Sequence, residues 1–165
     1  MLRRLALLAA VAAVAALGGG ALLDRAGGAK GAGDTESSRV ARVVDGDTIV
    51  LSGGERVRYI GIDTPESVKP GTPVQCYAKA ASHANQRLVA GQSVRLRFDA
   101  ERRDRYGRLL AYVYRAGDGL FVNAELVRRG YARTLTIPPD VSHAGEFRRL
   151  ARSARRAGRG LWSAC

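Results

Sequence analysis

Short runs of alternating hydrophobic and polar residues recur along the chain beyond residue 38, and turn-forming residues separate them. Alternation with a period of two is typical of strands that bury one face. The predicted strands are 39–44, 48–51, 56–62, 93–98 and 109–114. Asp45-Gly46 and Ser52-Gly53-Gly54 are expected to form the turns between the first three strands.

Three other segments carry apolar residues at helical spacing and predict helices over 74–89, 123–129 and 142–157. Gly91 and Gly130 are expected to end the first two helices, and Asn123 to cap the second. Five short strands with a helix between the third and fourth suit a small closed barrel of the oligonucleotide-binding type. The predicted fold class is therefore α+β, mainly β: a five-stranded OB-fold barrel with about three helices. The strand pattern alone does not exclude other small barrels.

The first 38 residues differ from the rest in composition. Arg3 and Arg4 precede an apolar run that extends to Leu17 or, read more generously, to Leu23. Residues 1–23 therefore predict a signal peptide or, as the alternative, an uncleaved signal anchor that tethers the protein to the membrane. Residues 24–38 are rich in Gly, Ala, Ser and charge, which predicts a flexible linker. The folded domain is expected to span 39–165 and to be secreted.

The predicted export bears on the state of the two cysteines, because an oxidising compartment favours disulfides. Cys76 and Cys165 form an even pair in an oxidising compartment, which predicts a disulfide between the C-terminal tail and the first helix. Two free thiols are the alternative.

The net charge of the chain indicates which classes of partner it favours. The formal net charge is +12, and only three of the 27 basic residues are lysine. Such a balance favours polyanionic partners, nucleic acid first and anionic membrane surfaces second. Arginine matches phosphate oxygens with a planar fork, although a genomic preference for arginine explains its abundance equally well.

Carboxylates gather at the ends of the first strands. Asp47 and Asp63 can meet only if their strands lie side by side, and two hard oxygen ligands suit Ca²⁺. Glu66 and Arg58 would stand beside the metal, where one could activate water and the other could neutralise a phosphate. Residue types and spacing thus outline a phosphodiesterase site.

Four segments resemble those of the thermonuclease (staphylococcal nuclease-like) family, in the same order along the chain. They are Asp45-Gly46-Asp47-Thr48, the run from Arg58 to Glu66, the run from Asp104 to Tyr112 and the run from Val122 to Ala132. The resemblance covers nearly the whole chain beyond the N-terminal segment. It implies the same barrel, with three helices packed around it.

The resemblance also implies roles for individual residues. Asp47, Asp63 and the backbone carbonyl of Thr64 match positions that hold Ca²⁺ in the family. Asp45 is expected either to support these ligands without binding the metal or to form the turn. Glu66 matches the residue that is assigned as general base.

Two arginines, Arg58 and Arg108, match the groups that clamp the phosphate in the transition state. Arg105 and Tyr106 match positions that contact the terminal phosphate and the nucleotide. There is one departure: the family's best-known member has two tyrosines against the nucleotide where this chain has Thr134-Leu135-Thr136-Ile137-Pro138. Base preference is therefore expected to differ.

The favoured hypothesis is a secreted Ca²⁺-dependent endonuclease that cleaves DNA and RNA with little sequence specificity, prefers single strands and acts as a monomer. By resemblance it would leave 3′-phosphate ends. One alternative is a non-catalytic OB-fold module that binds single-stranded nucleic acid, but all the catalytic positions are filled here. A third hypothesis is a cationic surface adhesin held by the N-terminal segment. His83 and His143 are expected on helix surfaces, without a role.

Overall fold

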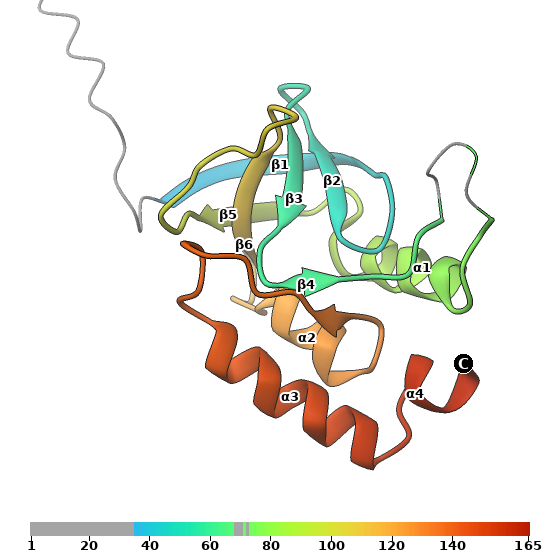
Figure 1. Cartoon of the computed structure of the whole chain (residues 1–165). Helices are drawn as coiled ribbons and strands as arrows, with labels where there is room; N and C mark the ends of the chain where they lie inside the picture. Colours follow the sequence, from blue (N-terminus) through green and yellow to red (C-terminus); the bar gives the residue numbers. More distant parts are fainter. Residues whose placement is uncertain (1–34, 68–70, 72) are drawn as a thin grey trace, which may run out of the picture.

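Five strands close into a barrel in the computed structural model, which describes residues 35–67, 71 and 73–165 (Figure 1). The barrel strands are β1 (Thr35–Val43), β2 (Thr48–Leu51), β3 (Arg56–Tyr59), β5 (Ser93–Arg97) and β6 (Leu109–Arg115). Their order around the barrel is β1-β2-β3-β6-β5, with β3 and β6 parallel and the other neighbours antiparallel. This architecture confirms the predicted OB-type barrel.

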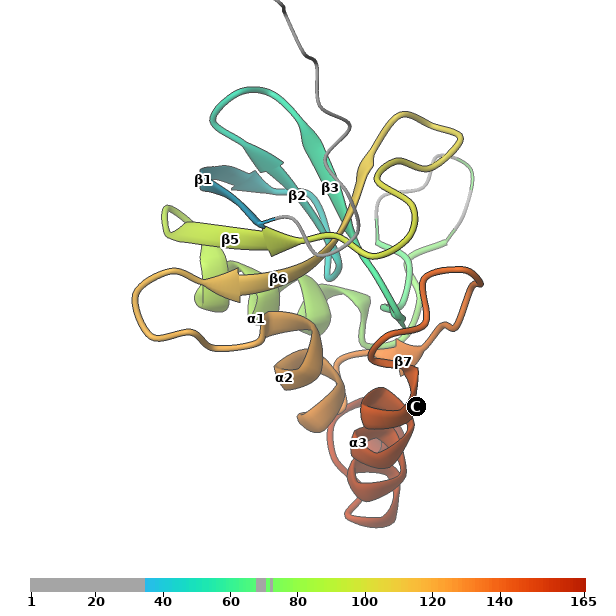
Figure 2. The same ribbon diagram turned by 90° about the vertical axis from the view of Figure 1, so that its left-hand side faces the viewer.

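Four helices and a two-stranded sheet surround the barrel in the described part of the chain. They are α1 (Ala78–Val89), α2 (Val122–Arg128), α3 (Ala144–Arg156), α4 (Leu161–Ala164) and the antiparallel pair β4 (Ile62–Asp63) and β7 (Arg133–Thr134). Helix α2 lies between the barrel and α3, so α3 has one side facing α2 and one side facing outward (Figures 1 and 2). None of the helices in the described residues is long and apolar enough to cross a membrane.

The strand predicted over 56–62 is interrupted, and the interruption positions part of the site. Gly61 adopts a positive φ of 80°, and a Cβ there would lie 2.4 Å from the ring of the buried Phe147. The chain turns at this glycine, because only a residue without a side chain fits so close to the ring. It leaves the barrel after β3 and pairs with β7 as β4.

Strand β1 begins four residues before the expected start of the domain. Thr35 pairs with Arg97 and the ladder to β5 continues to Arg39, so residues 35–38 belong to the barrel. Backbone hydrogen bonds hold these residues in the sheet whatever their side chains are. Their polar composition therefore did not reveal the strand and suggested a linker instead. The predicted signal peptide or anchor, residues 1–23, lies outside the described residues.

Two details of the helices differ from the sequence prediction. Helix α1 begins at Ala78 rather than near residue 74, after Tyr77 in the left-handed conformation. Asn123 lies inside α2 and does not cap it: its side chain accepts a hydrogen bond from the Val113 amide (3.0 Å) and donates one to the Ile60 carbonyl (2.9 Å). The prediction was wrong because a buried amide here joins the helix to the barrel.

One histidine also departs from its prediction. His143 sits just before α3 and is half-buried, with its ring 4.5 Å from that of Tyr112 and 4.8 Å from that of Phe121. It packs in an aromatic cluster rather than on a helix surface. The exposed position of His83 on α1 is as predicted.

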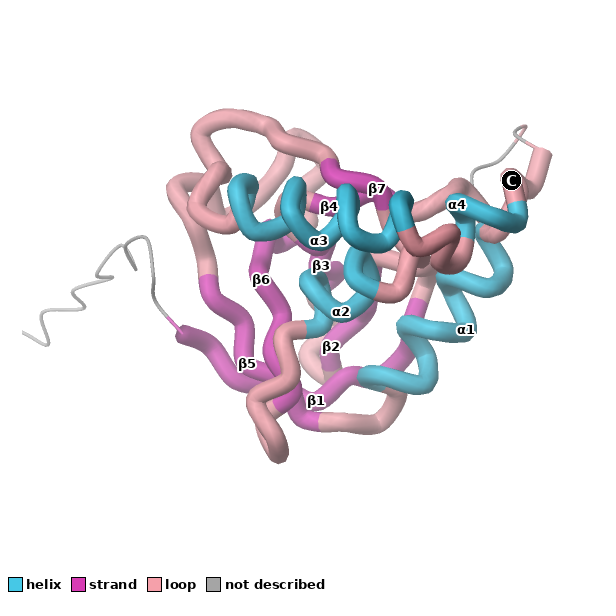
Figure 3. Tube along the Cα trace, turned by 90° about the horizontal axis from the view of Figure 1, so that it is seen from below, coloured by secondary structure: helices cyan, strands magenta, loops and turns pink. Residues whose placement is uncertain are grey.

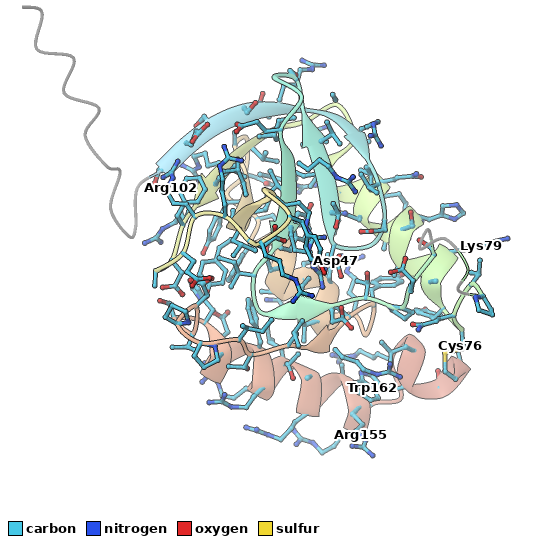
Figure 4. All side chains as sticks on the ribbon, turned by 45° about the horizontal axis from the view of Figure 1, so that its top comes forward. Asp47, Cys76, Lys79, Arg102, Arg155 and Trp162 are labelled. Carbon is cyan, nitrogen blue, oxygen red and sulfur yellow. A yellow bond between two sulfur atoms is a disulfide. The ribbon has the colours of Figure 1, made fainter. Side chains whose placement is uncertain are left out.

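The predicted disulfide is present. Cys76 and Cys165 are bonded, with their Cα atoms 6.0 Å apart. Cys76 comes two residues before α1, and the bond holds α4 beside that end of α1 (Figures 3 and 4).

Candidate active site

The turn between β1 and β2 carries the first site residue, Asp47. Its amide donates to Asp45 Oδ1 (3.0 Å), which fixes the turn. Gly46 is required between them, because a Cβ at that position would lie 2.6 Å from Thr64 Oγ1. The short motif therefore allows the turn and the end of β4 to approach each other closely.

Asp47 is buried and connects this turn to the end of β4 (Figure 4). Its Oδ2 accepts two hydrogen bonds from Thr64, one from the amide at 2.7 Å and one from the hydroxyl at 2.9 Å. Its Oδ1 accepts a longer bond from the Thr48 hydroxyl (3.3 Å). The amide and side chain of Thr64 thus orient Asp47, a role that the sequence did not predict for this residue.

Arg58, on β3, forms ion pairs with both predicted metal ligands. One guanidinium nitrogen contacts Asp47, and the other lies 2.8 Å from Oδ1 of the exposed Asp63. Burial lowers the pKa of Arg58, while the charge of Asp63 acts to raise it. Two carboxylates, one from the turn between β1 and β2 and one from β4, therefore converge on one cation.

These groups line a cavity of about 180 Å³, together with Glu66 and Arg108. The parallel pairing of β3 with β6 places Arg58 opposite Leu110, so Arg108 arrives at the same end of the barrel just before β6 begins. The five predicted catalytic and metal-binding side chains, Asp47, Arg58, Asp63, Glu66 and Arg108, all line this cavity. We call it the acidic cavity.

A fourth carboxylate in the acidic cavity is that of Asp45, which the sequence analysis assigned to the turn. Burial raises its pKa, the negative charge of Glu66 acts in the same direction, and a hydrogen bond with Thr48 and the charge of Arg58 oppose the rise. Its turn role is confirmed by the hydrogen bond from Asp47.

Known proteins share this arrangement of segments. A model of the family described as staphylococcal nuclease homologue matches residues 56–164. The chain is 45% identical over 130 residues to Thermonuclease from Staphylococcus intermedius, covering 77% of this chain and 76% of that protein. The chain belongs to the staphylococcal nuclease family. Thermonuclease from Staphylococcus hyicus is 40% identical over 131 residues, and Endonuclease YncB from Bacillus subtilis is 42% identical over 127 residues, which cover 59% of the latter protein.

The staphylococcal nuclease family suggests a divalent metal, and the donor set can be tested against it. Asp47 and Asp63 offer hard carboxylate oxygens of the kind that bind such a metal. Both already lie beside one positive charge, that of Arg58. In the described residues, no three His, Cys, Asp or Glu side chains form a group that could hold a metal ion. Asp47 and Asp63 are thus two oxygen ligands of the kind that a hard divalent cation accepts, together with carbonyls and water.

Glu66 is held from its backbone. Its amide donates to Gln75 Oε1 and its carbonyl accepts from the Gln75 amide, both at 2.9 Å. This pair of bonds closes the segment between Glu66 and Gln75 at its base, just before the disulfide at Cys76. Sequence analysis assigned no role to Gln75, because neither its residue type nor its spacing distinguishes it.

Asp104 holds the Arg108 loop, and the sequence left it without a role. Its Oδ2 accepts from Arg108 Nε (2.7 Å), and its Oδ1 accepts from the amides of Tyr106 (2.9 Å) and Arg108 (3.0 Å). Burial acts to raise the pKa of Asp104, but these hydrogen bonds outweigh it and leave the pKa below its usual value. An Asp followed by Gly107 at this spacing is the signal of a turn, which could have identified it.

A second buried contact supports the site from α1. Asn85 is fully buried, donates to the Asp45 carbonyl (3.0 Å) and accepts from the Tyr59 hydroxyl (2.9 Å). The signal for it was available, because Asn85 lies four residues from both Ala81 and Val89 on the apolar stripe of the helix. A polar residue there requires a buried partner.

Beside the acidic cavity lies a wider one of about 780 Å³, which shares Arg58 and Arg108 with it. Both predicted substrate-binding residues line it: Tyr106 is 67% exposed, and its hydroxyl accepts from Arg105 (2.6 Å). Leu135 and Ile137 line it as well. Aliphatic side chains therefore form part of its wall, in the segment where the sequence analysis expected a departure from the family's best-known member. We call it the wide cavity.

Proposed function

We propose that the protein is a secreted, Ca²⁺-dependent nuclease that hydrolyses phosphodiester bonds of DNA and RNA with little sequence specificity. One observation carries the proposal: Asp47 and Asp63 converge on Arg58 in a cavity that Glu66 and Arg108 also line. The nuclease names of the relatives support the reaction class. The net charge of +12 supports a polyanionic substrate.

The two arginines bind the scissile phosphate. Arg58 and Arg108 belong to both cavities, so a phosphate at their boundary receives N–H donors from two guanidiniums. Their charge is worth most when negative charge accumulates on the equatorial oxygens, which is the transition state. A nucleotide attached to that phosphate extends into the wide cavity, toward Tyr106.

Glu66 acts as the general base. Its carboxylate lines the acidic cavity, on which the phosphate borders, and there it orients a water molecule and accepts its proton. The water oxygen forms its bond to phosphorus as the bond from phosphorus to the 5′-oxygen breaks. The 5′-oxygen keeps the electron pair and takes up a proton from solvent to become a hydroxyl, and a 3′-phosphate remains on the other fragment.

The Ca²⁺ ion would be held by the carboxylates of Asp47 and Asp63 and the backbone carbonyl of Thr64. When bound, it supplies positive charge that polarises the phosphate and balances its developing charge. Thr64 and Thr48 keep Asp47 oriented for this purpose through the hydrogen bonds that they donate to it.

The sequence supports the remaining elements of the proposal. The apolar run in residues 1–23 supports export, with a membrane tether as the variant in which it is not cleaved. The exposed Tyr106 at the wide cavity supports a preference for single strands, whose bases are free to stack. No protein partner is implied, and we propose a monomer.

The test is hydrolysis of heat-denatured DNA by the full chain, with Ca²⁺ and with a chelator, for the wild type, Glu66→Gln and the control Glu36→Gln. Glu36 is half-exposed on β1 and pairs with Arg102, and neither residue lines a cavity. We expect cleavage that chelation abolishes, and a loss of about 10²–10⁴-fold in Glu66→Gln alone. If the wild type bound DNA without cleaving it, the nuclease proposal would fail and the non-catalytic binding module would take its place.

A further inference from the structure

Helix α3 carries a row of arginines on its outer side. Its thirteen residues include Arg148, Arg149, Arg152, Arg155 and Arg156, all exposed, whereas Phe147 and Ala154 on the opposite side are buried. Spacings of three, four and seven residues place the five arginines on one face. We call it the arginine face of α3.

This concentration of charge has no acidic counterpart in the described structure. The only carboxylate of α3 belongs to Glu146, at the first turn, and it is 3.0 Å from His143 Nδ1. Within the described residues, no ion pair involves any member of the arginine face, whereas Arg128 and Arg129 on α2 both pair with Glu125. Like charges at these spacings destabilise a helix, so the uncompensated row is a cost to the fold. Only the two arginines of the last turn are favoured by the helix dipole.

The arginine face connects to the acidic cavity through Trp162 and β7. Arg133 pairs in register with Asp63, and neighbours in such a pair point to the same side of the sheet. The guanidinium carbon of Arg133 is 5.8 Å from the centre of the Trp162 ring, and that of Arg155 is 5.6 Å from it. In Figure 4 Trp162 lies between Asp47 and Arg155. Arg133 therefore lies between Asp63, a predicted metal ligand, and the end of α3, with the Trp162 ring between it and Arg155.

We propose that the arginine face of α3 binds the flanking phosphates of the same polynucleotide strand whose scissile phosphate occupies the active site, with Arg133 as the link between them. The proposal rests on the proposed nuclease function and names a second contact region for its substrate. At 1.5 Å per residue, α3 is about 20 Å long, enough for several phosphates. Guanidinium forks match phosphate oxygens without reading the bases, which suits a nuclease with little sequence specificity.

An anionic membrane fits the arginine face less well. A helix that lies on a membrane inserts its apolar side between the lipids. The apolar side of α3 is occupied by the protein itself, since Phe147 is buried in the main core and α2 packs against the helix. Only the charged face is available, and that suits an extended polyanion in solution.

The test compares two triple variants of the full chain that remove the same charge. Arg148→Gln/Arg149→Gln/Arg152→Gln weakens the arginine face, and glutamine preserves helix propensity. Arg39→Gln/Arg42→Gln/Arg95→Gln is the matched control on β1 and β5, on the other side of the molecule from α3 (Figure 1). The substrates are long heat-denatured DNA and an oligonucleotide too short to reach from the cavities to α3. The readouts are kcat, KM and the salt dependence of DNA binding.

We expect the α3 variant to raise KM for long DNA about tenfold, to leave kcat and the short substrate unchanged, and to reduce the slope of log affinity against log salt by about 2. An equal effect in the control variant, or an equal loss on the short substrate, would overturn the proposal. The proposal would also be overturned if the α3 variant lost binding to vesicles of anionic lipid that the wild type binds, while its binding to long DNA stayed the same. If the wild type binds DNA but cleaves neither substrate, the nuclease proposal fails, and the salt slope still decides the role of α3.

Discussion

Two cavities meet at Arg58 and Arg108, and they are built in different ways. In the acidic cavity, Asp47 is buried and held by three hydrogen bonds from threonines, and the turn that carries it is fixed from α1 by Asn85. In the wide cavity, Tyr106 and Ile137 are exposed and belong to two loops that line it beside residues of β3, β4 and β6.

The difference separates chemistry from recognition. The acidic cavity is lined by all the catalytic residues that the sequence analysis predicted, whereas Leu135 and Ile137 come from the segment where that analysis expected a departure from the family's best-known member. Close packing leaves little freedom in the first region, since Gly46 has no room for even a methyl group. The exposed wall can accept other side chains without disturbing the fold. Variants should therefore change turnover in one cavity and substrate affinity in the other.

The largest effect is expected from Arg58→Lys. Lysine keeps the charge between Asp47 and Asp63 but loses the planar fork that binds the phosphate. We expect kcat to fall about 10²–10³-fold with KM changed little, as for the loss of one transition-state donor. Steady-state kinetics on heat-denatured DNA measure this. Arg56→Lys, exposed on the same strand, is the control and should behave as the wild type.

A smaller effect, on both stability and activity, is expected from Gly46→Ala. The new methyl group would lie 2.6 Å from Thr64 Oγ1 and push Thr64 away from Asp47. We expect a loss of about 1–3 kcal/mol in the free energy of unfolding, measured in urea, with reduced activity. Gly53→Ala, whose Cβ would meet nothing within 4 Å, should cost much less. Equal losses in the two variants would mean that the close approach does not matter.

Leu135→Tyr tests the other cavity. An aromatic ring in this wall can stack on a base, which contributes about 1–3 kcal/mol per base. We expect KM for single-stranded DNA to fall by about tenfold or less while kcat stays constant. Val141→Tyr provides the comparison, since Val141 is similarly exposed at 44% but does not line the wide cavity. A change in kcat would show that the two cavities are not independent.

The smallest effect is expected from Asp104→Asn, and it depends on pH. The pKa of Asp104 is lower in the folded protein than its usual value of 3.8, so its charged form stabilises the fold above that value. This contribution is lost as the pH falls through the folded pKa. Asp104→Asn should therefore be less stable than the wild type by about 1 kcal/mol at neutral pH, with the difference disappearing in acid. A difference that is constant with pH in urea titrations would contradict the assignment.

The sequence predicted the parts of the fold and site that depend on local chemistry. Alternation indicated the barrel strands, and Gly91 and Gly130 adopt the positive φ that ends a helix. Two of the four family-like segments contain Asp47, Asp63 and Glu66, which were predicted to share one site. The structure places all three at one cavity.

What the sequence did not predict depends on contacts between distant segments. The hydrogen bonds of Asn123 and Asn85 reach 63 and 40 residues along the chain, to Ile60 and Asp45. No local pattern specifies such a partner. Strand β7 has only two residues, too few for a period to be recognised. It is defined by its backbone pairing with Ile62 and Asp63 of β4. The break at Gly61 likewise follows from the position of Phe147.

The parallel pairing of β3 with β6 also has a consequence for how the protein matures. Arg58 and Arg108 reach one place only when Val57 pairs with Leu109 and Arg58 with Leu110, which closes a loop of about fifty residues. Pairing over such a distance is slow, because the entropy of closing the loop is lost before the contacts form. A chain that has made only its local hairpins therefore has separate fragments of a site. Arg58 and Arg108, which we propose bind the phosphate, come together only as the barrel forms, so the recovery of activity during refolding should report the completed fold.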